Sequence, residues 1–221
     1  MGELDLDTIG TFVALGGSFS THRRMDSQPE WPILWTVPKQ AIIPEGEPIQ
    51  LPPYVEDVVP GPEPAVVIDD VGEGLFRASV EEAADAVKGF TVSNDVTAKG
   101  KFPAYPYPDQ EGSLGRGYKI FPTFSPTLSR YEPLAADAID TDTTVEAVID
   151  GETVVSGSTD TMDWTVAELV AHVSKILRLQ ENDVISLGDP SQPTGYLDDA
   201  SEVICRVENV GELTNPVQRL D

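Results

Sequence analysis

Two acidic residues, Glu63 and Asp95, stand at the ends of short apolar runs that have the character of β-strands. Glu63 precedes the run 65–68, and Asp95 follows the run 90–93. A carboxylate at the end of a rigid strand can face a cleft, and a hard divalent cation needs carboxylates held in that way. The pair therefore predicts a metal site, although a chain with 38 acidic residues also places many carboxylates on its surface without a function.

His22 and Asp26 form a second candidate pair. If the surrounding segment is helical, the two residues lie four apart on one face, where a carboxylate can orient an imidazole. A single histidine among many acids is equally well explained as a surface residue. The residues alone leave both interpretations open.

The composition indicates a folded, strongly acidic protein. Its 221 residues carry 38 acidic and 14 basic side chains, for a net charge of −24 spread along the whole length. Such a surface suits a high-salt cytoplasm, where screening relieves self-repulsion, so we expect a halophilic, haloarchaeal source and a cytoplasmic location. The charge argues against nucleic-acid and membrane partners, and no apolar run reaches membrane-spanning length. Cys205 is the single cysteine, which excludes an intrachain disulfide.

The apolar patterns predict many short strands and two main helices. Capping boxes predict helices that begin after Ser79 and Thr165, the first of which we expect to end at Gly89. Asp150-Gly151 lies between two alternating runs and predicts a hairpin with a type I′ turn. The fold class expected is α+β, mainly β, as a sandwich or roll. Strands are expected at residues 11–15, 32–37, 41–43, 65–68, 90–93, 143–149, 152–156, 184–187 and, last, 203–207.

Proline and glycine divide the chain into a looser and a more regular part. Frequent prolines predict turns and extended pieces in an N-terminal segment, residues 1–56, which carries His22. Residues 57–221 are then expected to form the catalytic core. Within the core, residues 100–117 are rich in Gly, Pro and Tyr without periodicity, which favours an ordered lid.

Several of these segments resemble, in order, motifs of the fumarylacetoacetate hydrolase family. Residues 89–99, Gly-Phe-Thr-Val-Ser-Asn-Asp-Val-Thr-Ala-Lys, resemble the family's Gly-Tyr-Thr-Val-x-Asn-Asp-Val-Ser-Ala-Arg. Residues 207–217 resemble its closing Ile-x-Gly-Ile-Gly-x-Leu-x-Asn-Pro-Val, and residues 64–68 resemble the Leu-Ala-Val-Val-Ile that follows its metal-binding Glu-x-Glu. Residues 119–124 resemble its Lys-x-Phe-Asp-Thr-Phe. The resemblance covers essentially the whole chain.

This resemblance implies a mixed β-sandwich roll, usually a homodimer, with Mg²⁺ as the expected cofactor and Mn²⁺ or Ca²⁺ as alternatives. It also implies action on a small anionic 2-oxo or dioxo acid, by C–C hydrolysis, decarboxylation, dehydration or keto–enol isomerisation. In the family, the metal holds the substrate's carboxylate and 2-oxo oxygens and stabilises an enolate. A histidine–glutamate pair activates water or moves a proton.

Carried over position by position, the resemblance implies a set of site residues. Glu63 and Asp95 are expected to bind the metal. His22 is expected to act as general base, and Lys119 to stabilise the developing negative charge. Basic residues that fall in segments lining the family's pocket are expected to attract and bind the anionic substrate: Arg23, Lys99 and Arg116.

The chain also departs from the family pattern at the site. The first glutamate of Glu-x-Glu is Gly61, and the glutamate three residues after the family's histidine is Met25, so Asp26 is expected to take its place. Two alternatives to a metal-dependent hydrolase, lyase or isomerase therefore stay open: a binding or assembly protein with impaired catalysis, and a metal-free enzyme. Further departures are Val37 for a lysine, Pro122 for an aspartate and Asp189 for a threonine.

Overall fold

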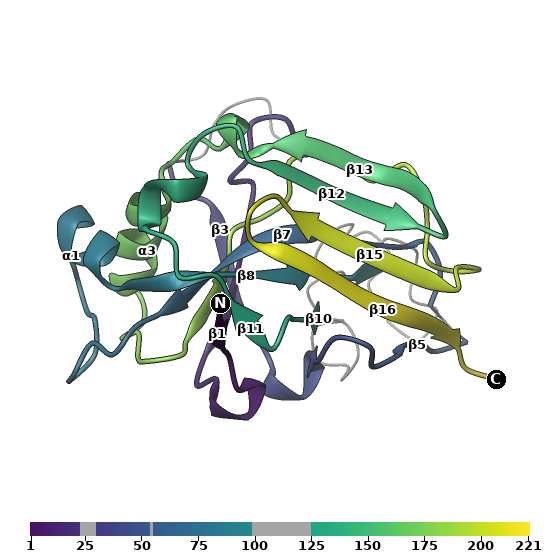
Figure 1. The fold of residues 1–221 in the computed structure, drawn as a ribbon, viewed down its shortest axis with the longest axis horizontal. Coiled ribbons are helices and arrows are strands. Elements are labelled where there is room, and N and C mark those ends of the chain that lie inside the picture. Colours follow the sequence, from purple (N-terminus) through teal and green to yellow (C-terminus); the bar gives the residue numbers. More distant parts are fainter. Residues whose placement is uncertain (23–29, 54, 99–124) are drawn as a thin grey trace.

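The computed structural model describes residues 1–22, 30–53, 55–98 and 125–221, in which strands predominate (Figure 1). The strands are β1 (Gly2–Glu3), β2 (Phe12–Gly16), β3 (Ile33–Val37), β4 (Ile42–Ile43), β5 (Ile49–Leu51), β6 (Val58–Val59), β7 (Pro62–Ile68), β8 (Val87–Asn94), β9 (Thr97–Ala98), β10 (Ser125–Pro126), β11 (Arg130–Tyr131), β12 (Thr144–Ile149), β13 (Glu152–Ser158), β14 (Val184–Ser186), β15 (Glu202–Val207) and β16 (Gly211–Arg219). The α-helices of this part of the chain are α1 (Val80–Asp85) and α3 (Val166–Ser174). Short 3₁₀ turns are η1 (Leu6–Thr8), η2 (Lys39–Ala41), η4 (Ala136–Ile139) and η5 (Thr159–Thr161).

Two five-stranded sheets pack face to face. One has the strand order β3-β2-β14-β7-β8, and the other has the order β13-β12-β15-β16-β5. Both sheets are mixed, because the β2–β14 and β5–β16 pairs are parallel while their other neighbours are antiparallel. β15 and β16 lie over β7 and β8, and the two helices pack together at one end of the molecule (Figure 1). The expected α+β, mainly β sandwich with two main helices is confirmed.

β7 is buried along its whole length because both faces of its sheet are covered. Val66 and Ile68 point into the larger apolar cluster, which fills the space between the two sheets. Ala65 and Val67 point the other way, into a smaller cluster that includes side chains of β2. A continuous apolar run is the pattern expected of a strand buried on both faces. The burial makes β7 a rigid support for the residues at its beginning.

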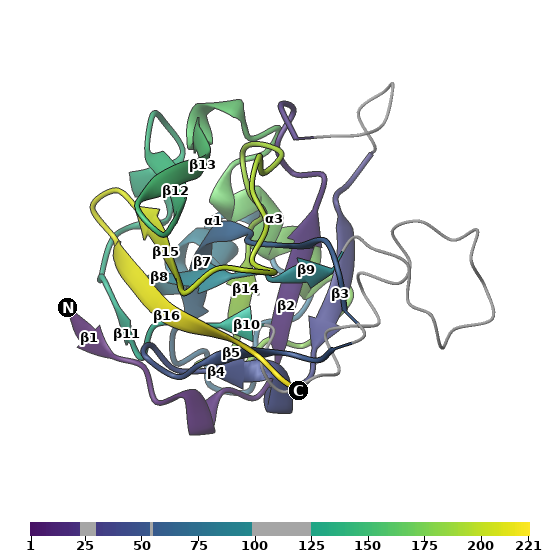
Figure 2. The same ribbon diagram turned by 90° about the vertical axis from the view of Figure 1, so that its right-hand side faces the viewer.

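Residues of the N-terminal segment contribute to both sheets. β2 stands beside β14 in the first sheet, with β3 at its outer side (Figure 2), and β5 pairs with β16 in the second. These pairings join residues that are more than a hundred positions apart in sequence. The division of the chain at residue 56 stays a prediction.

Both helices begin at the expected capping boxes. The Oγ of Ser79 accepts a hydrogen bond from the N–H of Glu82 at 3.2 Å, and the Glu82 carboxylate accepts one from the N–H of Ser79 at 2.8 Å. Thr165 and Glu168 make the same reciprocal pair at α3. Two backbone donors that would otherwise lack partners are satisfied at each helix start. Among the described residues, no helix is long and apolar enough to cross a membrane.

The expected extent of the first helix is wrong. α1 ends at Asp85, and β8 begins at Val87, so Gly89 lies inside a strand instead of ending the helix. A Cβ atom at Gly89 would lie 2.2 Å from the carbonyl oxygen of Glu132, on the segment that pairs with β8 there. The glycine therefore serves the close approach of two backbones.

The hairpin between β12 and β13 is confirmed. Asp150 and Gly151 have φ angles of +48° and +91°, as a type I′ turn requires. By contrast, β16 extends beyond the last strand expected from the sequence. It follows a turn at Asn209, where φ is +60°, and pairs antiparallel with β15.

An aromatic stack attaches the segment before β3 to α3. The rings of Trp31 and His172 lie 4.3 Å apart at 12°, and Trp164 stacks on Trp31 at 6.0 Å. The Nζ of Lys175 lies 5.0 Å from the centre of the Trp31 ring. Partial burial, and then the charge of Lys175, lower the pKa of His172 below its ordinary value.

Candidate functional site

Glu63 projects from β7 between two prolines that restrict the backbone around it. Pro62 and Pro64 have fixed φ angles, and a residue that precedes a proline is confined to extended conformations. A central strand usually excludes proline, because proline cannot donate to the ladder. Here the N–H of Leu187 donates to the carbonyl of Pro64 at 3.0 Å. The Leu187 carbonyl would normally accept a bond from the N–H that proline lacks, and it accepts one from the Oγ of Ser18 instead. The ladder is thus completed by a side chain.

The carboxylate of Glu63 is buried and held in one orientation. Glu63 is 3% exposed. Its Oε2 accepts hydrogen bonds from the Ser186 Oγ at 2.5 Å and from the Gly188 N–H at 3.0 Å. The Ser93 Oγ lies 2.6 Å from the Ser186 Oγ. Since Ser186 donates its proton to Glu63, Ser93 is the donor in that second bond. Two donors on one oxygen fix the rotation of the carboxylate.

Asp95 directly follows β8 and lies close to the beginning of β7. Its N–H donates to the carbonyl of Gly61 at 2.8 Å, while the N–H of Gly61 donates to the Asn94 Oδ1 at 3.0 Å. Glu63 is paired with Ser93, and Pro62 is paired with Asn94, the residue directly before Asp95. The two residues predicted for the metal therefore lie close to each other, where β7 begins and β8 ends.

Gly61 closes the space beside Asp95. A Cβ atom at Gly61 would lie 2.8 Å from the carbonyl oxygen and 3.2 Å from the Cβ of Asp95. The first of these contacts is too short for a real side chain, and it involves backbone that cannot turn away. The strand ends approach each other this closely only with glycine at position 61. Within the described residues, no group of three or more His, Cys, Asp or Glu side chains is arranged to hold a metal ion.

His22 contacts the segment that follows β14. Its Nδ1 contacts the Oδ1 of Asp189 and lies 3.2 Å from the backbone oxygen of Asp189. The Gln192 side chain donates to the carbonyl of His22 at 3.2 Å. The expected partner, Asp26, lies outside the described residues. The structure thus adds Asp189 as a carboxylate partner of His22.

One short segment, residues 186–189, contacts both Glu63 and His22. Ser186 and the Gly188 N–H bind the carboxylate, and Asp189 binds the imidazole. In the sequence, position 189 is a departure from the family motif and carries no predicted role. The signal that could have found it is an acid directly after a glycine at the end of a buried strand, since such residues often face a site.

The family model for the C-terminal domain of fumarylacetoacetate (FAA) hydrolase matches residues 11–218. The chain belongs to this family. It is 26% identical over 211 residues to the mitochondrial oxaloacetate tautomerase FAHD1 of Bos taurus, with 94% of this chain and 91% of the relative covered.

Two solved structures of the fumarylacetoacetate hydrolase family type share this fold. The 5-carboxymethyl-2-hydroxymuconate delta-isomerase from Mycobacterium smegmatis has a TM-score of 0.77 and 26% identity, covering 96% of this chain and 80% of that one. The fumarylpyruvate hydrolase from Pseudomonas aeruginosa, solved in complex with Mn²⁺ and pyruvate, has a TM-score of 0.76 and 20% identity, covering 96% and 91%. The relatives named here are enzymes, as expected for a member of this family.

Cys205 is excluded as a reactive group of this family member. The residue is fully buried in β15. Burial raises the pKa of its thiol far above the ordinary value, and the negative charges of Glu63 and Asp189 raise it further. A thiol that stays protonated is a poor nucleophile and a poor metal ligand.

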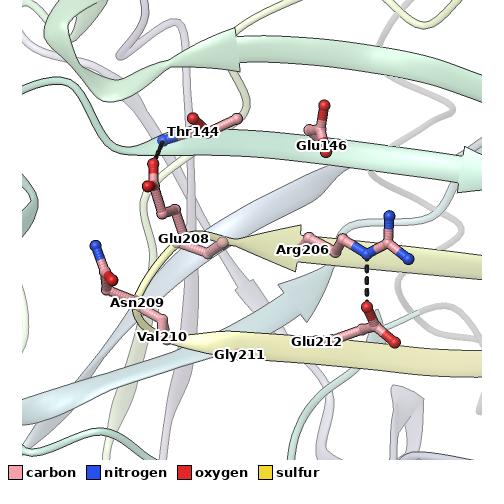
Figure 3. A pocket seen from close by; sticks show the side chains of 9 residues that line it. Thr144, Glu146, Arg206, Glu208, Asn209, Val210, Gly211 and Glu212 are labelled. Carbon is pink, nitrogen blue, oxygen red and sulfur yellow. Dashed lines mark hydrogen bonds and ion pairs between the residues drawn. The ribbon is translucent and has the colours of Figure 1, made fainter.

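A hollow of about 540 Å³ lies elsewhere, at the turn between β15 and β16 (Figure 3). Two pairs of its polar groups are bound to each other. The Arg206 Nε donates to Glu212 at 2.5 Å, and the Thr144 N–H donates to Glu208 at 3.1 Å, which lowers the pKa of Glu208. None of the residues predicted for the site is among the residues that line it. We assign the hollow no part in the chemistry.

Several predicted site residues lie outside the part of the chain that the structure describes, and their roles stay predictions. The same holds for the expected lid at residues 100–117. These site residues are Arg23, Asp26, Lys99, Arg116 and Lys119.

Proposed function

We propose that this protein is a divalent-metal-dependent enzyme that isomerises or cleaves a small 2-oxo acid. The observation that carries the proposal is that Glu63 and Asp95 lie close to each other where β7 begins and β8 ends, with the Glu63 carboxylate buried and held by two hydrogen bonds. The names of two relatives support the substrate class, since they denote reactions of oxaloacetate and of 5-carboxymethyl-2-hydroxymuconate. A homodimer and a cytoplasmic location stay part of the proposal.

The residues present fit a hard divalent cation. Mg²⁺ and Mn²⁺ prefer carboxylate oxygens, and Mg²⁺ is commonly held by one or two carboxylates, with water and substrate completing its shell. Glu63 and Asp95 would hold the ion, and Gly61 adds no ligand, so several positions remain for water and substrate. The fumarylpyruvate hydrolase complex with Mn²⁺ and pyruvate supports this pairing of a metal with a 2-oxo acid. A bound cation would draw electron density from the substrate's oxo group.

The residues of the chain would bind the substrate and move a proton. Two hydrogen bonds already orient the Glu63 carboxylate, so it would need little reorganisation to bind a cation. His22 is the proposed general base, taking a proton from the carbon next to the oxo group or from a water molecule. Lys119 is the proposed stabiliser of the developing negative charge. Basic residues proposed to bind the anionic substrate are Arg23, Lys99 and Arg116.

Calorimetric titration with Mn²⁺, with and without oxalate as an enolate mimic, tests the proposal. We expect the protein to bind Mn²⁺, more tightly with oxalate, and to catalyse metal-dependent keto–enol conversion or decarboxylation of oxaloacetate. Asp95→Asn is expected to lower the affinity for Mn²⁺ by about tenfold or more and to abolish turnover. Glu56→Gln makes the same charge change at an exposed side chain and should preserve both. Full activity of Asp95→Asn would refute the assignment.

The close contact between Gly61 and Asp95 favours a second candidate, a binding or assembly protein with impaired catalysis. In that case the missing carboxylate leaves the site too weak to retain a cation. The same titration distinguishes the two functions. Absence of Mn²⁺ binding, even with oxalate, would favour the second candidate, while turnover in the presence of EDTA would favour a metal-free enzyme.

A further inference from the structure

We propose that Asp189 is the positioning residue for His22, fixing the imidazole so that Nε2 is its basic nitrogen. The inference rests on the proposed function, in which His22 is the general base. It names a partner on a different element from the one that the resemblance implies. The family's partner follows the histidine by three residues, whereas Asp189 follows β14, in the position of a threonine of the family motif.

The contacts of Nδ1 determine the tautomer of His22. This nitrogen faces two oxygens of Asp189, the carboxylate Oδ1 and the backbone oxygen at 3.2 Å. An ionised carboxylate and a carbonyl only accept hydrogen bonds, so the proton lies on Nδ1. In the neutral ring the lone pair therefore lies on Nε2. Asp189 thus acts on both the orientation of the ring and the choice of the nitrogen that accepts a proton.

The charge of Asp189 favours the state of His22 that follows proton transfer. The side chains of the two residues are 13% and 23% exposed, so water screens their attraction only in part. A carboxylate in direct contact stabilises an imidazolium. Among the described residues, the contacts of His22 include one charged side chain, that of Asp189. The carboxylate of Glu63 is connected to Asp189 through the neighbouring Gly188, whose N–H donates to Glu63.

The backbone that precedes Asp189 is anchored at several points. The N–H of Leu187 donates to Pro64 at 3.0 Å, and its carbonyl accepts from Ser18. The N–H of Gly188 donates to Glu63 at 3.0 Å. Each anchor lies on an element of the buried first sheet or directly after it. Asp189 is therefore held by a rigid backbone, as a residue that orients a catalytic base must be.

Nitrogen-15 NMR of the imidazole rings tests the inference without metal or substrate. The chain has two histidines, so His172→Gln assigns the His22 signals. We expect the wild type to show the Nδ1–H tautomer. In Asp189→Asn, the pKa of His22 should fall by about one unit, and the tautomers should mix. Asp199→Asn, the same change at an exposed residue, should alter neither.

Kinetics provide the second measurement. The acidic limb of the kcat/KM profile should move to lower pH in Asp189→Asn by the same amount as the NMR pKa, and Asp189→Glu should restore part of the shift. If Asp189→Asn does not fold, Asp189→Thr, which carries the family's residue, replaces it. A wild type with the Nε2–H tautomer, or a variant with unchanged tautomer and pKa, would overturn the inference. An inactive wild type with the Nδ1–H tautomer would refute the proposed function but uphold the positioning role.

Discussion

Gly61→Glu restores the carboxylate that the family motif carries, and it is the obvious change to strengthen the metal site. The structure predicts that this variant is less stable and binds Mn²⁺ no more tightly than the wild type. The reason is the contact that any side chain would make at Gly61. Its Cβ atom would lie 2.8 Å from the carbonyl oxygen of Asp95 and 3.2 Å from the Asp95 Cβ.

Gly61→Ala isolates the cost of that contact. Overpacking a close-packed site costs about 1–3 kcal/mol, and loss of glycine from the unfolded chain returns about 0.4–1 kcal/mol. The net loss of about 1.5 kcal/mol corresponds to a fall in Tm of about 3–6 °C for a domain of this size. Since the atom that must move belongs to Asp95, the affinity for Mn²⁺ should also fall, by about tenfold.

Thermal unfolding and calorimetric titration with Mn²⁺ measure both effects. Gly195→Ala is the matched control, because its Cβ atom would meet the Val154 side chain at 2.6 Å, away from Asp95. We expect the Gly195→Ala control to be less stable than the wild type but to bind Mn²⁺ with the same affinity. A Gly61→Glu variant that melts with the wild type and binds Mn²⁺ tenfold more tightly would refute the reasoning.

Two further predictions concern a hydrogen bond and a titration. Ser186→Ala removes a donor from buried Glu63, so we expect a loss of about 1–3 kcal/mol in urea unfolding and about tenfold weaker Mn²⁺ binding; an unchanged affinity would contradict the positioning of Glu63. The folded-state pKa of His172 is below its ordinary value of 6.5, so its contribution to stability is present above pH 6.5 and is lost as the pH falls through the folded-state pKa. His172→Phe should therefore reduce the loss of stability between about pH 8 and 5, measured as urea midpoints, and an equal loss in both proteins would argue against it.

Much of the fold could be predicted because its signals are local. The capping box at Ser79 and the Asp150-Gly151 turn depend on residues within three positions of one another, and both are confirmed. The extent of α1 was wrong because Val87 fits a helical stripe and a strand equally well. Val87 is in a strand because it pairs with β7, which lies about twenty residues earlier in the chain. Periodicity alone cannot weigh that distant contact.

The candidate site was predictable in part. Glu63 and Asp95 were proposed from motifs in or directly after single strands, and the structure brings the two residues close together, while their binding of a metal stays a prediction. The contact of Asp189 with His22 could not be found in this way, because 167 positions separate the two residues. The tight space beside Gly61 was hidden for the same reason. A missing side chain is visible in the sequence, but the neighbour that forbids it is visible only after the strands have paired.

The segment Ser186–Asp189 has a consequence for engineering. It holds the proposed metal-binding carboxylate at one end and the proposed base at the other. A substitution that shifts either end will disturb both reactive groups, so the effects of changes at Ser186 and Asp189 should be strongly non-additive. Variation of substrate preference is therefore best sought in residues outside this segment, where one group can be altered while the other keeps its place.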